Sequence, residues 1–160
     1  MKKITFILFA LIAGTTFAQS TDTATAPVTA EIVSPIGISL DSGTMDFGTF
    51  ISASATGATV VLSADGTTRT FTETAMEMAA YGVFGVPTFA VTKDDDVTYK
   101  IGLAVTTPVT GEVTLTDLTS TIGATSNTAA AFSVGGTLNV PTTATAGSYA
   151  GEVTVTVTYE

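Results

Sequence analysis

Apolar and polar residues alternate in short runs along most of this chain. The clearest run covers residues 153–159, Val-Thr-Val-Thr-Val-Thr-Tyr, and places Val153, Val155, Val157 and Tyr159 on one face, with three threonines on the other. A period of two is the period of a β-strand, and β-branched residues suit a pleated sheet. We therefore predict a strand here with a buried valine face and a solvent-facing threonine face.

Similar runs recur, and Gly, Pro, Asn and Asp separate them. The further predicted strands cover residues 28–33, 36–40, 45–51, 59–63, 67–72, 88–92, 97–105, 112–118 and 131–140. Short strands with turn signals about every 8–12 residues are typical of an antiparallel sandwich or barrel. The pattern predicts an all-β fold, an immunoglobulin-like antiparallel β-sandwich in a single domain.

Two stretches interrupt this pattern. Residues 74–81 contain good helix formers, and Thr74 with Glu77 has the spacing of a capping box, so either a short helical turn or a loop or edge strand fits. Gly135-Gly136 is not followed by a helix signal, so it does not match a phosphate-binding loop. We expect a turn or bulge there.

The N-terminus has the organisation of a secretory signal peptide over residues 1–18. Lys2 and Lys3 form the positive region, an apolar run follows over 4–13, and small residues precede a predicted cleavage site before Gln19. The apolar run is about ten residues, against the ~20 that a bilayer span needs. We expect an exported protein of the periplasm, cell surface or extracellular space, with no transmembrane anchor after cleavage.

The remaining chain divides into two parts by composition. Residues 19–26 are small and polar, typical of a flexible lead-in, and residues 27–160 carry the strand pattern of the sandwich domain. After loss of Lys2 and Lys3 the formal charge is 3 − 14 = −11. Such an acidic chain is a poor partner for nucleic acid, because that binding needs Lys and Arg at the phosphates.

Composition also excludes several chemistries. The chain has no Cys and no His, so it forms no disulfide, no thiolate nucleophile, no Cys/His zinc site and no imidazole-based triad. Asp94-Asp95-Asp96 is the one dense carboxylate cluster, and we interpret it as a solvated hairpin turn rather than a calcium loop. Asp41 and Asp46 are a weak match to a glycosidase pair. We predict no catalytic, cofactor-binding or metal site.

Several segments together resemble a known family. They are Val28–Ile36, Met45–Phe50, Phe132–Pro141 and Ala146–Tyr159. The chain resembles the secreted bacterial domain-of-unknown-function family 4402, which is similar to the spore coat protein U domain and, more distantly, to chaperone–usher fimbrial subunits. Those subunits typically end with a penultimate aromatic residue and a Gly fourteenth from the end, and Tyr159 and Gly147 occupy these positions.

The resemblance implies an incomplete sandwich that a neighbour's N-terminal strand completes. The implied subunit-contact residues are the alternating positions of the N-terminal segment and residues of the C-terminal block: Ala24, Ala26, Val28, Ala30, Ile32, Gly147, Val153, Val155, Val157 and Tyr159. The disulfide usual in fimbrial subunits is absent. The same alternation also fits the first strand of a self-sufficient sandwich.

The functional expectation that follows is a non-catalytic structural subunit of a bacterial surface or extracellular assembly, similar to a fimbria or pilus. Its expected partners are itself, as a homopolymer, or other surface subunits, with a periplasmic chaperone. The alternative is a secreted monomeric binding module or adhesin for carbohydrate or a host surface, for which loop aromatics such as Tyr81 and Phe84 are the cue.

Overall fold

The computed structural model of this chain describes residues 21–53, 56–78, 82–107, 109 and 112–160. The chain divides into two units, residues 1–32 and the compact unit Val33–Glu160. Within the first unit, residues 21–32 form no strand, and all their side chains are exposed. The strand expected over 28–33 is therefore absent. A strand needs a neighbouring edge for its N–H and C=O groups, and this segment is given none.

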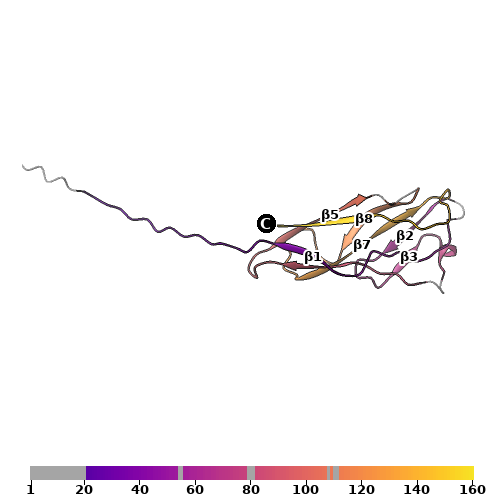
Figure 1. The fold of residues 1–160 in the computed structure, drawn as a ribbon, viewed down its shortest axis with the longest axis horizontal. Coiled ribbons are helices and arrows are strands. Elements are labelled where there is room, and N and C mark those ends of the chain that lie inside the picture. Colours follow the sequence, from indigo (N-terminus) through magenta and orange to yellow (C-terminus); the bar gives the residue numbers. More distant parts are fainter. Residues whose placement is uncertain (1–20, 54–55, 79–81, 108, 110–111) are drawn as a thin grey trace, which may run out of the picture. The chain divides into compact units, whose positions relative to one another are not determined.

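In the described part of the compact unit there are eight strands and one short helical turn (Figure 1). The elements are β1 (Gly37–Ser42), β2 (Ala58–Leu62), β3 (Arg69–Phe71), η1 (Thr74–Met76), β4 (Thr88–Thr92), β5 (Tyr99–Thr107), β6 (Thr114–Ser120), β7 (Ala131–Val140) and β8 (Glu152–Tyr159). Most coincide with the alternating runs of the sequence. The expected run 45–51 forms only isolated bridges, from Asp46 to Gly85 and from Phe50 to Glu77.

The larger sheet is built on β7, the longest strand. One edge of β7 pairs with β6, and the other pairs with β4 along its first residues and with β2 along its last. β1 then pairs with β4, and β3 pairs with β2, all antiparallel. Side chains alternate along β7, which places Phe132, Val134, Leu138 and Val140 in the core.

The second sheet contains β5 and β8, paired antiparallel along almost their full length. Ile101 and Leu103 of β5 and Val155 and Val157 of β8 pack on a buried cluster that includes Phe132 of the larger sheet. The two sheets thus enclose a shared core, which confirms the all-β antiparallel sandwich. Among the residues that the structure describes, no helix is long and apolar enough to span a membrane.

Two local expectations change in the structure. Gly135 and Gly136 lie inside strand β7, so of the expected turn or bulge the turn is wrong, whereas the β6–β7 ladder does have a bulge-like register shift opposite them. The irregularity is in the partner instead, because β6 shifts register between Thr116 and Thr119, where Asp117 has a φ of 46°. Gly135 is required by close approach, since a Cβ there would lie 2.3 Å from the carbonyl oxygen of Leu62.

Residues Thr74–Met76 form a 3-10 turn. The residue that precedes it is Glu73, and no side chain caps the turn, so the capping box suggested by Thr74 and Glu77 is not formed. Met76 is nevertheless almost fully buried. The turn thus serves to place one large apolar side chain in the core, and residues 79–81 lie outside the described part of the chain.

The turn between β2 and β3 is organised by Asp65. Its carboxylate accepts hydrogen bonds from the Ser63 hydroxyl at 2.6 Å, the Thr67 hydroxyl at 2.8 Å and the Thr67 N–H at 3.0 Å. Gly66 follows with a φ of 69°, a conformation that favours glycine. The Ser63 hydrogen bond, followed by those of Thr67, holds the pKa of Asp65 below its ordinary value.

Candidate functional site

An apolar groove of about 1250 Å³ opens on the compact unit between β1 and β8. Its lining comes from β1, the segment 43–52, strands β4, β6, β7 and β8, and the segment 144–152 that leads into β8. The apolar lining residues are Leu40, Met45, Phe47, Phe50, Ile51, Met78, Phe89, Val109, Val113, Leu115, Leu138, Val140, Ala144, Ala146, Tyr149 and Val153.

The floor of this groove is the protein core itself. Val113, Leu138 and Val140 line it and belong to a buried cluster, with exposures of 2–6%. Leu40 points the same way from β1 as the partly buried Ile38, since positions two apart in a strand share a face. Leu40 nevertheless remains 58% exposed. A core-facing leucine is exposed because nothing in the described chain lies over it.

Strand β8 has the two faces that its sequence predicts. Glu152 and the three threonines are exposed, whereas Val153, Val155, Val157 and Tyr159 are half-buried. Val155 and Val157 pack on the core cluster, and Val153 lines the groove. The valine face is therefore turned inward but is only partly covered by its own chain.

The backbone of the same four residues is directed toward the free edge of β8. Thr98 precedes β5 and Glu160 follows β8, and the N–H of Glu160 donates to the carbonyl oxygen of Thr98. Thr98 and Glu160 are therefore a hydrogen-bonded pair that continues the β5–β8 ladder by one residue. Hydrogen-bonded and non-bonded pairs alternate in an antiparallel ladder. The next pair, Tyr99 with Tyr159, is therefore non-bonded, and so are the pairs made by the three valines. Their N–H and C=O groups point away from β5.

The corresponding argument holds for β1. The N–H of Val91 donates to Ala130 at 2.8 Å, so it is directed away from β1, where Val91 is opposite Ile38. That pair is therefore non-bonded, and Ile38 and Leu40 turn their N–H and C=O groups to the outer edge. The described strands place no partner on the outer edge of β1 or of β8. The groove thus has an apolar floor and two unpaired strand edges.

The outer edge of β5 is covered at its beginning. The N–H groups of Tyr99 and Ile101 donate to the carbonyl oxygens of Asn127 and Ala124, at 3.1 and 2.9 Å. The buried amide of Asn127 in turn donates to the carbonyl oxygens of Tyr99 and Gly123. Loop 123–127 therefore protects the beginning of β5, whereas the described strands place no partner along the outer edge of β8.

One wall of the groove is supported by the only arginine of the chain. The Arg69 guanidinium lies 4.9 Å from the Phe71 ring centroid and 5.2 Å from that of Phe84. Its Nη1 donates to the carbonyl oxygen of Phe47 at 2.7 Å, which ties down the segment that lines the groove. Phe84, a cue for the adhesin alternative, thus packs on Arg69, and Tyr81 lies outside the described residues.

Two of the expected contact regions reach this site. Val153 and Gly147 both line the groove, and a Cβ added at Gly147 would meet nothing within 4 Å. The N-terminal candidates Ala24, Ala26, Val28, Ala30 and Ile32 lie in the separate segment 21–32, where they are exposed. Sequence reasoning missed Leu40 and the wall formed by residues 43–52, because only pairing reveals that they border an open edge.

The acidic candidates have structural roles. Loop 93–98 joins β4 of the larger sheet to β5 of the smaller one, so the expected hairpin turn at Asp94–Asp96 is instead a crossover between sheets. Asp46 accepts a hydrogen bond from the N–H of Gly48 at 2.7 Å. Among the described residues, no three acidic side chains lie close enough to hold a metal ion.

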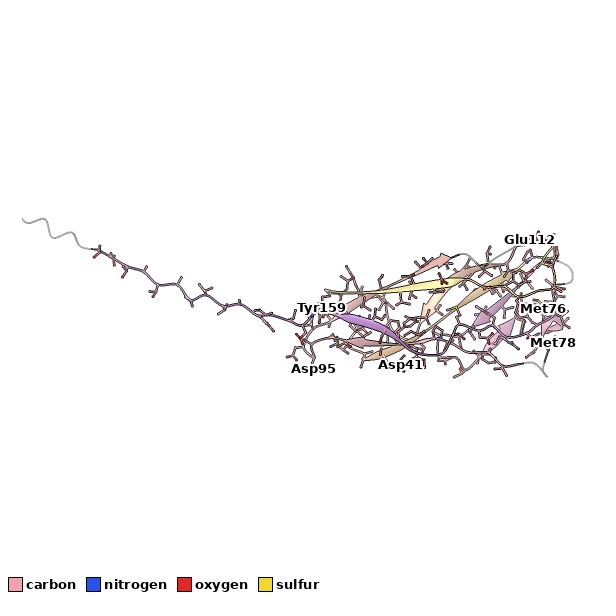
Figure 2. The ribbon with its side chains drawn as sticks, in the orientation of Figure 1. Asp41, Met76, Met78, Asp95, Glu112 and Tyr159 are labelled. Atoms are coloured by element: carbon pink, nitrogen blue, oxygen red, sulfur yellow. The ribbon has the colours of Figure 1, made fainter. Side chains whose placement is uncertain are left out.

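Figure 2 shows how the ends of the compact unit differ. Tyr159 and Asp95 lie at one end, where β8 finishes, and Met76, Met78 and Glu112 lie at the opposite end. Met78 lines the groove, together with residues from the beginning of β8 and the last part of β1. The groove therefore lies toward the end opposite Tyr159.

Fold and groove together define a class of protein: an antiparallel β-sandwich domain with an apolar groove between two strands, β1 and β8, whose outer edges have no strand partner in the described chain. The model of one family, described as Domain of unknown function (DUF4402), matches residues 36–159, and the chain belongs to this family. Comparisons with curated proteins and with solved structures found no match.

Proposed function

We propose that this protein is an exported, non-catalytic structural subunit whose groove accepts a β-strand from another subunit, as in the fimbrial assemblies that its sequence resembles. The observation that carries the proposal is the apolar groove between the unpaired edges of β1 and β8. An added strand would bond to both edges and cover the core, which is the physics of β-strand addition.

The segment 21–32 has the chemistry of such a strand. It precedes the compact unit in the sequence and forms no strand of its own. Small or apolar residues alternate with polar ones along it. Val28 and Ile32 are its large apolar side chains and are 93% and 94% exposed. Pro27 has no N–H to donate, so a continuous ladder is expected only from Val28 onward.

The groove and the N-terminal segment both expose apolar side chains to water, and burial of these side chains would favour assembly. Unpaired strand edges over apolar surface attract other strands and must be covered by something. The groove and the Val28–Ile32 face are complementary in being apolar, and strand pairing would remove both from water. A periplasmic chaperone that occupies the groove before assembly is consistent with the same chemistry.

The test is the size distribution of the protein purified after export of the full chain. Wild-type protein should form a series of multimers in light scattering and on unboiled gels. Val28→Asp with Ile32→Asp should abolish the series, because two charges would enter an apolar floor. Thr25→Asp with Thr29→Asp adds the same charge to the opposite face of the strand and should leave most of the series intact.

A groove variant tests the acceptor side. Gly147→Leu places an apolar side chain in the groove without a clash at its Cβ. It should leave the fold intact and reduce multimer formation. Multimers that form equally well in all these variants, or wild-type protein that stays monomeric at high concentration, would show the proposal to be wrong.

A further inference from the structure

Ser34, at the beginning of the compact unit, has both of its backbone groups held by distant side chains. Its N–H donates to Asp94 Oδ2 at 2.6 Å, and its carbonyl oxygen accepts a hydrogen bond from the Tyr159 hydroxyl at 2.8 Å. The N–H of Asp94 also donates to the Tyr159 hydroxyl at 3.3 Å, which closes the set. We call these three residues the Ser34 clasp.

The clasp fixes the point where the N-terminal segment joins the domain, far from the groove. Ser34 is held beside Tyr159, the last residue of β8, whereas the groove is lined by Val153 and Thr154 at the beginning of that strand. The distance along β8 between Tyr159 and Val153 is about 20 Å at about 3.3 Å per residue. Figure 2 shows Tyr159 at the end of the domain opposite Met78.

Length alone does not keep the segment out of its own groove. Residues 24–32 span about 30 Å when extended, which is enough to lie back along β1 if the chain reversed at residues 33–36. The sequence Ser34-Pro35-Ile36-Gly37 has the residue preferences of a type I turn, with Ser first, Pro second and Gly fourth. A hairpin that inserts the segment into its own domain is therefore available to this sequence.

Such self-insertion would defeat assembly. A strand tethered by a short link competes at an effective concentration of about millimolar, above the concentration of most free subunits. Insertion into a second copy dominates only where insertion into the same copy is blocked. In this structure the Tyr159 hydroxyl takes the carbonyl oxygen of Ser34, which in a type I turn would accept from the N–H of Gly37. Asp94 holds the N–H of Ser34, and Ile36, the third residue of that turn, packs on the core.

We propose that the Ser34 clasp prevents the N-terminal segment from entering its own groove and so commits it to the groove of a second copy of this chain. The inference rests on the proposed strand addition, and it adds that the strand enters another copy of the chain rather than its own. Head-to-tail contacts of this kind are heterologous and generate open filaments rather than closed dimers. Tyr159, which the family resemblance implied to be a subunit-contact residue, acts here as a positioning residue.

The first test opens the clasp. Asp94→Ala with Tyr159→Phe removes both side-chain partners of Ser34 and keeps an aromatic ring at position 159. Protein exported as the full chain should shift from multimers to a monomer, with a rise of about fivefold or more in monomer fraction, because the tethered strand competes at about millimolar effective concentration. Hydrogen exchange should show residues 28–32 protected in that monomer. Asp95→Ala, an exposed neighbour in the same loop, is the matched control and should behave as wild type.

The second test leaves every residue of the clasp in place. A flexible Gly/Ser insertion of about twelve residues between Ile32 and Val33 has a root-mean-square span of about 20 Å, which matches the distance to the groove. It should also give a protected monomer. This variant covers the case in which the clasp substitutions weaken the fold.

The outcomes separate the two proposals. If the wild type forms multimers and both variants form the same multimers, the proposed role of the clasp is wrong, and strand addition is still supported. A wild-type monomer with a protected N-terminal segment would also overturn the clasp. A wild-type monomer whose segment exchanges freely would overturn strand addition itself. Protected monomers in both variants, with multimers in the wild type and the control, support the inference.

Discussion

Replacing Ile32 with alanine should weaken assembly strongly and leave the isolated domain unchanged. Ile32 is 94% exposed in the single chain, so its truncation removes no contact there, and the free energy of unfolding should stay within about 0.5 kcal/mol of wild type. In an inserted strand the same side chain would be buried. The substitution removes three carbon atoms at about 0.8 kcal/mol each, or about 2.4 kcal/mol. That corresponds to an approximately 50-fold weaker subunit contact.

A graded series makes this expectation sharper. Val28→Ala removes two carbon atoms and should weaken the contact by about 15-fold. Thr29→Ala, on the opposite face, should have little effect. Sedimentation over a range of protein concentrations measures the contact, and urea unfolding of the monomer measures domain stability. Equal effects of all three substitutions, or a loss of monomer stability with Ile32→Ala, would refute the assignment of faces.

Three further predictions concern the domain itself. Gly135→Ala should destabilise by about 1–3 kcal/mol in urea unfolding, because its Cβ would overlap backbone atoms of the neighbouring segment; Gly147→Ala, with open space around its Cβ, should be neutral, and equal stability of both would contradict the packing. Val155→Asp should unfold the protein or abolish its accumulation, since it places a charge against the core, whereas circular dichroism of Thr158→Asp should show a folded domain. The folded-state pKa of Asp65 is lowered, so the stabilisation that its carboxylate provides is present above about pH 3.9 and is lost as the pH falls through the folded pKa. Asp65→Asn should make the thermal midpoint less sensitive to acid over that interval, and an unchanged acid profile would count against this role.

The sequence predicted the strands of the sandwich correctly where apolar and polar residues alternate along the chain. Residues 88–92 and 131–140 were expected as strands and form β4 and β7 with the same bounds. The alternation of Val153, Val155 and Val157 also predicted which face of β8 turns inward. These features are local, because a period of two fixes both the strand and its faces without reference to a partner.

Expectations failed where pairing, rather than pattern, decides the outcome. Residues 28–33 alternate as well as any strand but form none, and residues 45–51 form isolated bridges and a groove wall. Gly135-Gly136 suggested a turn or a bulge, yet the pair lies within β7, where another backbone approaches closely, and the register shift is in the partner strand β6. Alternation shows that a segment can pair, but it carries no information about which edges are free to receive it.

By itself, the sequence determined that this chain is an acidic, cysteine-free, all-β domain with a valine-faced last strand and an alternating N-terminal segment. Tertiary structure alone decided that β1 and β8 leave their facing edges unpaired, that Leu40 stands exposed over the core, and that Ser34 is clasped at the opposite end from the groove. The physical reason is that side-chain periodicity is a property of neighbours in the chain. A free edge or a long-range hydrogen bond, in contrast, depends on which strands the whole fold brings together.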